Sequence, residues 1–412
     1  MPENAAPSLH IALPVMDEQE FLPRTLECIA AQLYPHFKVY ICVNQPDAYW
    51  DDATSRGIAE RNLSTLKQLL QQSDPRIFVI DHTSPGRGWK GKKHGVGHAR
   101  KVIMEEISRR AAPDDVVISL DADTSFPENY FQTVAENFRR NPDAVAASLP
   151  YYHPLPKDPS AARAILRYEI YMRHYFLNLA RIGSPYAFTA MGSAMAFTVK
   201  AYRAIGGMTP KLSGEDFYFL QKLRKYGTVL LWNETMVFPE ARFSDRVFFG
   251  TGPAMIKGAA GDWSSYPIYP DSLFKALLET YLTAPLLFLE TFDTEVIRFL
   301  KRALKEEDPF RLLRENHSDS LHFIRAFHEK LDGLRILQFL KTHHKSFHGS
   351  DERNLRQFLT DHYPASTSAV PSVFREDFSF DSAGVEELST VRDFLFSQEM
   401  AVRRQKFIAG PS

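Results

Sequence analysis

The sequence predicts a doubly wound α/β fold with a mostly parallel sheet, followed by a mostly helical region. Apolar residues alternate with other residues at 9–15 and 37–43, which is the period of a strand. Residues 116–120 form a continuous apolar run, which is typical of a parallel strand buried on both faces. Between these strands apolar residues recur at helical spacing, as at 22–33. Strands and helices that alternate in this order indicate a parallel sheet covered by helices.

Further segments extend this pattern along the chain. We expect strands at residues 9–15, 37–44, 77–80, 116–120 and 144–149, and strand character again at 187–199. We expect helices at residues 22–33, from the end of a polar loop at 45–52 to about residue 72, and from 97 to about 110. A further helix is expected after a capping box at 125–128. From about residue 270 the strand patterns end and helical spacing dominates. We therefore expect one domain at residues 1–269 and a mostly helical region at residues 270–412.

The composition excludes several classes of protein. The 412 residues include 49 Lys and Arg and 50 Asp and Glu, so the formal net charge is −1 at pH 7. Because a nucleic-acid-binding protein usually carries a basic excess, we expect no nucleic-acid partner. Two cysteines are too few for a disulfide scaffold or a cysteine-based zinc cluster. No segment has the pattern of a signal peptide or of a membrane span, so we expect a cytoplasmic protein without a transmembrane segment.

Two carboxylates follow the buried run at 116–120. Asp121 and Asp123 are two residues apart, so on an extended chain their side chains point to the same side. Such a pair can hold a divalent cation, and the cation can in turn hold a diphosphate. The alternative is a solvated acidic turn in which the aspartates bond backbone amides.

A loop rich in glycine and basic residues spans residues 86–100. Glycine lets the backbone approach a phosphate and the basic side chains neutralise it, so the loop favours an anionic ligand. Its glycines nearly match a P-loop, but Lys93 stands where that motif needs Ser or Thr. They also nearly match a dinucleotide fingerprint, which requires its glycines directly between strand and helix. A flexible surface loop is the alternative.

An acidic pair opens a predicted helix at residue 215. Ser213 and Asp216 have the spacing of a helix-capping pattern, which is the structural alternative for Asp216. A carboxylate at the start of a helix is stabilised by the positive end of the helix dipole. We therefore expect Asp216 to be ionised at neutral pH, which is the state that a general base needs.

Two arginines lie beyond this helix, at positions 242 and 246. Their guanidinium groups are suited to phosphate or carboxylate, because they donate two parallel hydrogen bonds. The alternative is a surface group of ion pairs with Asp245.

Together these motifs resemble family 2-like glycosyltransferases with the GT-A fold, over about residues 8–261. The resemblance rests on the order of the motifs along the chain. Residues 11–18 are similar to the family's opening strand and loop, which touch the nucleoside, and residues 95–100 to its glycine–Ala-Arg segment over the diphosphate. Asp121-Ala122-Asp123 matches the metal motif, Gly192-Ser193 lies where the donor-sugar and acceptor loop falls, and Glu215-Asp216 resembles the Glu-Asp motif.

Carried over residue by residue, the resemblance implies a complete site. It assigns donor binding to Pro14, Val15, Glu18, Asn44, Gly97, Arg100, Asp121, Gly192, Ser193, Arg242 and Arg246. It assigns the divalent metal, Mn2+ or Mg2+, to Asp121 and Asp123, and the role of general base to Asp216. Glu215 and Trp263 are expected beside the acceptor or behind the reacting groups.

Two features depart from the family pattern. The family often carries paired aspartates after its second strand, where this chain has Val43-Asn44-Gln45, and Asn44 can still bond the edge of a base. The family's late metal ligand is often His, whereas Glu240, Arg242 or Asp245 occupies that region here.

The resulting expectation is a metal-dependent glycosyltransferase with a Rossmann-like GT-A domain. It would move a sugar from a nucleotide-diphosphate donor to an acceptor hydroxyl, with inversion at the anomeric carbon if the resemblance extends to stereochemistry. The acceptor is a glycan, a lipid-linked sugar or a small molecule. Two alternatives share the motifs: a nucleotidyltransferase of sugar phosphates, and a non-catalytic protein that binds a sugar nucleotide.

Overall fold

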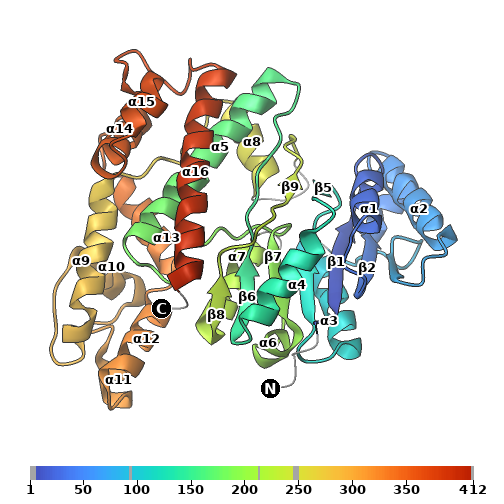
Figure 1. Cartoon of the computed structure of the whole chain (residues 1–412), viewed down its shortest axis with the longest axis horizontal. Coiled ribbons are helices and arrows are strands. Elements are labelled where there is room, and N and C mark those ends of the chain that lie inside the picture. Colours follow the sequence, from blue (N-terminus) through green and yellow to red (C-terminus); the bar gives the residue numbers. More distant parts are fainter. Residues whose placement is uncertain (1–5, 92–94, 212–213, 245–249, 410–412) are drawn as a thin grey trace. The chain divides into compact units, whose positions relative to one another are not determined.

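The computed structural model describes residues 6–91, 95–211, 214–244 and 250–409 (Figure 1). Contacts within the chain divide it into two compact units. The first unit comprises residues 1–165, 189–256 and 403–412, and the second comprises residues 166–188 and 257–402. The chain passes between the units within helices α5 (Pro159–Arg181), α8 (Thr251–Ala259) and α16 (Val385–Ala409). The expected domain boundary after residue 269 stays a prediction.

A seven-stranded sheet in the order β3-β2-β1-β4-β7-β6-β8 forms the centre of the first unit. Its strands are β1 (Leu9–Val15), β2 (Phe37–Asn44), β3 (Ile77–His82), β4 (Val116–Ser119), β6 (Ala144–Ser148), β7 (Met195–Thr198) and β8 (Thr228–Leu230). The first four pair in parallel, as do β6 and β8, while β7 runs antiparallel to β4 and β6. The predicted α/β fold with a mostly parallel sheet is confirmed.

The helices of the first unit also follow the predicted order. They are α1 (Leu22–Ala30), α2 (Arg56–Gln71), α3 (Val96–Arg110), α4 (Tyr130–Arg140), α6 (Val199–Ala204) and α7 (Glu215–Tyr226), with a 3-10 turn η1 (Asp47–Trp50). The predicted capping box at 125–128 is wrong, because Ser125 lies in the short strand β5 (Thr124–Ser125) and α4 begins only at Tyr130. β5 pairs antiparallel with β9 (Phe238–Pro239), so a partner distant in sequence determines its conformation.

The order of the strands reverses direction at β1, at the edge of the sheet where the parallel strands have their carboxyl ends. β1 lies between β2 and β4, so the chain leaves β1 toward one side for β2 and later returns on the other side as β4. In open α/β sheets, ligands bind outside the carboxyl ends of strands at such a point. Residues 16–18 follow β1 and residues 121–123 follow β4. The predicted nucleoside and metal motifs therefore lie at this edge.

The second unit consists of helices throughout its described part. Its helices beyond α8 are α9 (Asp271–Leu287), α10 (Glu295–Leu304), α11 (Arg311–Asn316), α12 (Ser320–Lys330), α13 (Gly333–His344), α14 (Asp351–His362), α15 (Ser366–Ala369) and the 3-10 turn η2 (Pro371–Phe374). Phe274, Phe323, Phe327 and Phe339 are fully buried and form part of its core. The expected helical C-terminal region is confirmed.

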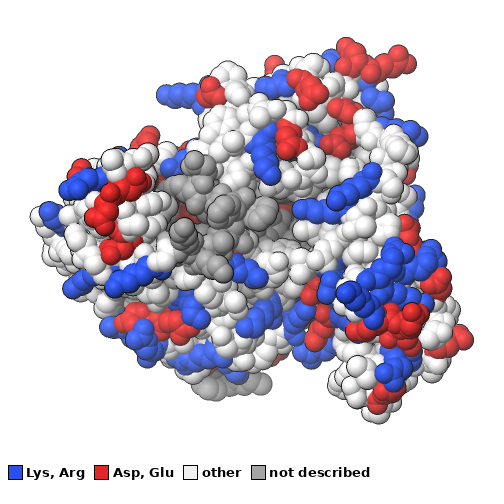
Figure 2. All heavy atoms as spheres, turned by 180° about the vertical axis from the view of Figure 1, so that it is seen from behind, with Lys and Arg blue, Asp and Glu red and all other residues white. Residues whose placement is uncertain are grey.

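The surface carries charges of both signs. On the face shown in Figure 2, Lys and Arg side chains are interspersed with Asp and Glu. Within the described part of the chain, no helix combines the length and the apolar composition that crossing a membrane requires.

Candidate active site

Two clusters of charged side chains lie at this edge of the sheet in the first unit. The Arg100 cluster consists of Arg100, Asp121, Glu215 and Asp216, and the Arg242 cluster consists of Arg242, Glu18 and Asp123. Each cluster joins residues that are distant in sequence. Arg100 and Glu215 are 115 positions apart, and Glu18 and Arg242 are 224 positions apart.

Arg100 is a buried cation near the start of α3, with only 3% of its side chain exposed. Its Nη2 donates a hydrogen bond to Asp121 Oδ1, and its Nη1 lies 3.4 Å from Glu215 Oε1. Burial lowers the pKa of Arg100, but the neighbouring carboxylates of Asp121, Glu215 and Asp216 outweigh this effect and raise it. Arg100 therefore holds together a metal-motif carboxylate and the acidic pair of α7.

Two glycines of the predicted site have no side chain where Arg100 and Glu215 pack against the backbone. A Cβ atom on Gly192 would overlap the Arg100 guanidinium. A Cβ atom on Gly97 would lie 2.7 Å from the Lys211 carbonyl oxygen and 3.2 Å from Glu215 Cγ. Both glycines are thus needed for close approach within the Arg100 cluster, which gives a physical reason for their place in the sequence motifs. Ser193, the neighbour of Gly192, is also buried.

Asp216 lies in the first turn of α7, which Gly214 precedes with a φ of 72°. Its Oδ1 accepts a hydrogen bond of 2.7 Å from the backbone N–H of Phe217. The capping partner expected from the sequence, Ser213, lies outside the described residues. Burial and the neighbouring Glu215 raise the pKa of Asp216 to about 7, although Arg100 opposes them. This direction runs against the expectation of a fully ionised Asp216 at neutral pH, because burial and Glu215 outweigh Arg100 and the hydrogen bond from the Phe217 N–H.

The Arg242 cluster joins the chain after β9 to the residues that follow β1 and β4. Arg242 Nη2 lies 2.5 and 2.7 Å from the two carboxylate oxygens of Glu18 and 2.8 Å from Asp123 Oδ2. The Phe21 ring packs against the guanidinium, with 4.4 Å between Cζ and the ring centroid. Burial lowers the pKa of Arg242, but Asp123 and Glu18 outweigh burial and raise it. One cation therefore neutralises two carboxylates that the sequence assigned to the donor and the metal.

The residues expected near the nucleoside lie at the ends of β1 and β2. Pro14 and Val15 are buried in β1. Asn44 donates a 3.0 Å hydrogen bond to the Val15 carbonyl and accepts one of 3.0 Å from Trp89 Nε1, so protein partners already engage its amide. Trp89 also stacks on His82, with 4.1 Å between ring centroids. Sequence reasoning did not assign Trp89 or His82 to the site, although Trp89 lies within the glycine-rich loop.

The aspartates of the expected metal motif each contact a different arginine. Their carboxylate oxygens are the ligands that Mg2+ and Mn2+ prefer, so their chemistry fits such an ion. Among the residues that the structure describes, neither belongs to a group of three His, Cys, Asp or Glu side chains placed to share a metal ion. Magnesium is usually held by one or two carboxylates together with the phosphates of a substrate, and the residues present fit that mode of binding.

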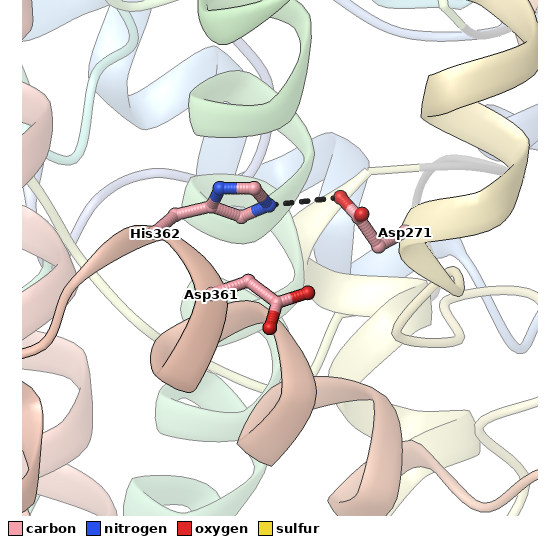
Figure 3. A group of neighbouring side chains, drawn as sticks. All are labelled: Asp271, Asp361 and His362. Carbon is pink, nitrogen blue, oxygen red and sulfur yellow. Dashed lines mark hydrogen bonds and ion pairs between the residues drawn. The ribbon is translucent and has the colours of Figure 1, made fainter.

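A group of three potential metal ligands occurs instead in the second unit. Figure 3 shows Asp361 and His362 of α14 beside Asp271 of α9, where the three ligand atoms lie within 4.8 Å of one another. Asp271 already contacts His362 at 3.0 Å, Arg181 at 2.6 Å and Lys275 at 2.8 Å. Arg181 and Lys275 therefore supply positive charge to Asp271 from within the chain.

Two residues of the predicted site remain apart from these clusters. Arg246 lies outside the described residues. Trp263 belongs to the second unit, where Arg167 Cζ lies 5.3 Å from its ring centroid. Its expected place near the acceptor stays a prediction.

Residues 116–262 match the family model described as Glycosyl transferase family group 2. This segment includes the Asp-x-Asp motif, Gly192 and the Glu215–Asp216 pair. For this segment, the match agrees with the resemblance that the sequence motifs indicate. No curated protein sequence matches the chain significantly.

Similar solved structures include two proteins in complex with nucleotide sugars. The S. aureus TarS 1-349 structure in complex with UDP-GlcNAc is 10% identical, with 97% of this chain and 92% of that chain covered and a TM-score of 0.39. The mannosyltransferase PcManGT from Pyrobaculum calidifontis, in complex with GDP-Man and Mn2+, is 14% identical, with 97% and 90% covered and a TM-score of 0.37. UDP-GlcNAc is the ligand of the TarS structure, and GDP-Man and Mn2+ are the ligands of the PcManGT structure.

Proposed function

We propose, from the glycosyl transferase family group 2 domain at residues 116–262, that this chain moves a sugar from a nucleotide-diphosphate donor to an acceptor hydroxyl. The observation that carries the proposal is the Arg100 cluster. One buried arginine bonds Asp121 of the Asp-x-Asp motif and Glu215, and its charge also acts on Asp216, a carboxylate whose pKa is raised to about 7. A group with a pKa near the working pH is suited to proton transfer.

The donor would bind outside the carboxyl ends of β1 and β4. Arg242 is the described cation best suited to the diphosphate, because its side chain is 24% exposed whereas that of Arg100 is 3% exposed. Arg100 then acts as a positioning residue that fixes Asp121 and Glu215. We further propose that Asp121 and Asp123, with Glu18 nearby, hold Mn2+ or Mg2+. When bound, the cation would stabilise the negative charge of the departing nucleoside diphosphate.

Asp216 would act as the general base. The acceptor oxygen forms a bond to the anomeric carbon while the bond from that carbon to the diphosphate oxygen breaks. The acceptor proton passes to an Asp216 carboxylate oxygen, and the electrons of the broken bond leave with the nucleoside diphosphate. Direct displacement of this kind inverts the anomeric centre. Glu215, which is buried beside Arg100, supports Asp216 by raising its pKa.

The proposal is tested by following the products with a panel of nucleotide sugars, with and without Mn2+. Thermal shift with nucleoside diphosphates and nucleotide sugars first identifies the donor. Release of nucleoside diphosphate that depends on an added acceptor supports a glycosyltransferase. Release of pyrophosphate from a nucleoside triphosphate and a sugar phosphate would instead support a nucleotidyltransferase. Donor binding without turnover on glycan, lipid-linked or small-molecule acceptors would support a binding protein.

A further inference from the structure

Three carboxylate oxygens converge on a single nitrogen atom in the Arg242 cluster. Arg242 Nη2 lies 2.5 and 2.7 Å from Glu18 Oε1 and Oε2, and 2.8 Å from Asp123 Oδ2. The side chains of Glu18 and Asp123 are 8% and 16% exposed, so the shared charge lies in a partly buried place. Nη2 therefore occupies the point at which a cation would interact with both carboxylates.

A divalent cation would compete with Arg242 for these oxygens. Mg2+ binds oxygen ligands at about 2.0–2.1 Å and Ca2+ at about 2.3–2.6 Å, so either ion would have to occupy nearly the same place as Nη2. A second positive charge at that place is repelled as long as the guanidinium remains there. Glu18 and Asp123 can thus serve the guanidinium or a metal ion, but not both.

We propose that Arg242 is an internal counter-cation that blocks metal binding at Glu18 and Asp123 until a donor diphosphate draws it away. This inference rests on the proposed function and adds to it the order in which the donor and the metal ion bind. A diphosphate offers oxygens that match the paired N–H groups of a guanidinium, so it can replace Glu18 and Asp123 as the partner of Arg242. The released carboxylates, together with the phosphates, then form the kind of ligand set that magnesium prefers. Metal and donor therefore bind cooperatively through Arg242.

The backbone near Arg242 is held independently of this side chain. β9 pairs with β5, and the Glu240 N–H donates a 3.1 Å hydrogen bond to the Asp123 carbonyl. Removing the guanidinium should consequently leave the two carboxylates in place. They would be close together without a counter-charge, which destabilises the protein until a metal ion binds.

The experiment compares Mn2+ binding by the wild-type chain and the Arg242→Gln variant, first without nucleotide and then with saturating UDP or GDP, whichever binds. Arg24→Gln is the matched control, because Arg24 forms an exposed ion pair with Glu240 at 3.0 Å and contacts neither Glu18 nor Asp123 in the described interactions. Calorimetry gives the Mn2+ affinity, and thermal melting with and without EDTA shows whether each variant is folded.

Without nucleotide, Arg242→Gln should bind Mn2+ about 5- to 150-fold more tightly than the wild type or Arg24→Gln. Its melting temperature should also rise more on addition of Mn2+. Nucleoside diphosphate should increase Mn2+ affinity strongly in the wild type and little in Arg242→Gln. The double variant Glu18→Gln/Arg242→Gln should lose the gain in Mn2+ affinity, because two of the three oxygens are altered.

An Arg242→Gln variant that is folded and binds Mn2+ no more tightly than the wild type would overturn the inference. If the wild type nevertheless transfers sugar, the proposed function stands. If no donor is used by the wild type, the proposed function fails, whereas the comparison of Mn2+ affinities without nucleotide still decides the role of Arg242.

Discussion

Buried charges occur in both units, but they are balanced differently. In the second unit, Glu169, Arg173, Arg392 and Glu399 are all buried, and these two arginines bond these two glutamates at 2.7–3.1 Å. In the Arg100 cluster, one arginine faces the three carboxylates of Asp121, Glu215 and Asp216, and the pKa of Asp216 is raised. Four side chains with matched charges need no further cation, whereas a negative surplus favours a proton, a metal ion or another positive group. The difference therefore distinguishes charges that hold helices together from charges to which the proposed function assigns a chemical role.

The largest expected effect is on turnover, in the Arg100 cluster. Asp216→Asn should lower acceptor-dependent turnover by about 100- to 10,000-fold, because Asn cannot accept a proton. Donor affinity and melting temperature should change little, since Asn can still accept the hydrogen bond from the Phe217 N–H. Steady-state kinetics, calorimetry and thermal melting on the same preparation measure all three. Turnover near that of the parent would move the role of base to another residue, with Glu215 the first to test.

The next effect concerns stability, in the second unit. Glu399→Gln should lower the free energy of unfolding by about 3–5 kcal/mol, because it leaves Arg173 buried with less compensating charge. The matched control is Glu387→Gln in the same helix, whose pair with Arg375 is exposed and should contribute at most about 1 kcal/mol. Chemical denaturation compares the two variants. If both variants lose a similar free energy of unfolding, then the buried ion pair of Glu399 contributes no more to stability than the exposed ion pair of Glu387.

Removal of the buried arginine from the first unit should affect the donor. Arg100→Ala should weaken donor binding by about 10- to 100-fold, which is about 1.4–2.8 kcal/mol of binding free energy. The loss follows because Asp121 and Glu215 would no longer be held in place. Calorimetry with the identified donor measures it, and an unchanged affinity would show that Arg100 has a structural role alone.

The last effect is the dependence of stability on pH. The pKa of Asp216 is about 7 in the folded chain, above its ordinary value, so the wild type loses stability as pH rises from about 4 through 7. The unfolded chain releases this proton at lower pH than the folded chain does. Asp216→Asn lacks the effect, so its stability relative to the wild type should be greater at pH 8 than at pH 4, by up to about 4 kcal/mol. Urea unfolding at both pH values measures the free energy of unfolding of the variant and of the wild type. If the difference between the two proteins is the same at pH 4 and at pH 8, the pKa of Asp216 is not raised.

Local patterns in the sequence predicted most of the first unit. Strands β1, β2, β3, β4 and β6 were predicted, since the apolar alternation or apolar run of a strand is a property of neighbouring residues. Helix α5 was not predicted. Its buried face carries Arg167, Glu169 and Arg173, and these charges interrupt the apolar spacing by which a buried helix is recognised.

The sequence by itself determined the α/β order, the Asp-x-Asp motif after a buried strand, and the acidic pair at the start of α7. Only the tertiary structure decided which charges meet. Arg100 reaches Glu215 across 115 positions and Arg242 reaches Glu18 across 224, and no local pattern encodes such pairs. The raised pKa of Asp216 has the same origin, because burial and neighbouring charges exist only once the chain is folded.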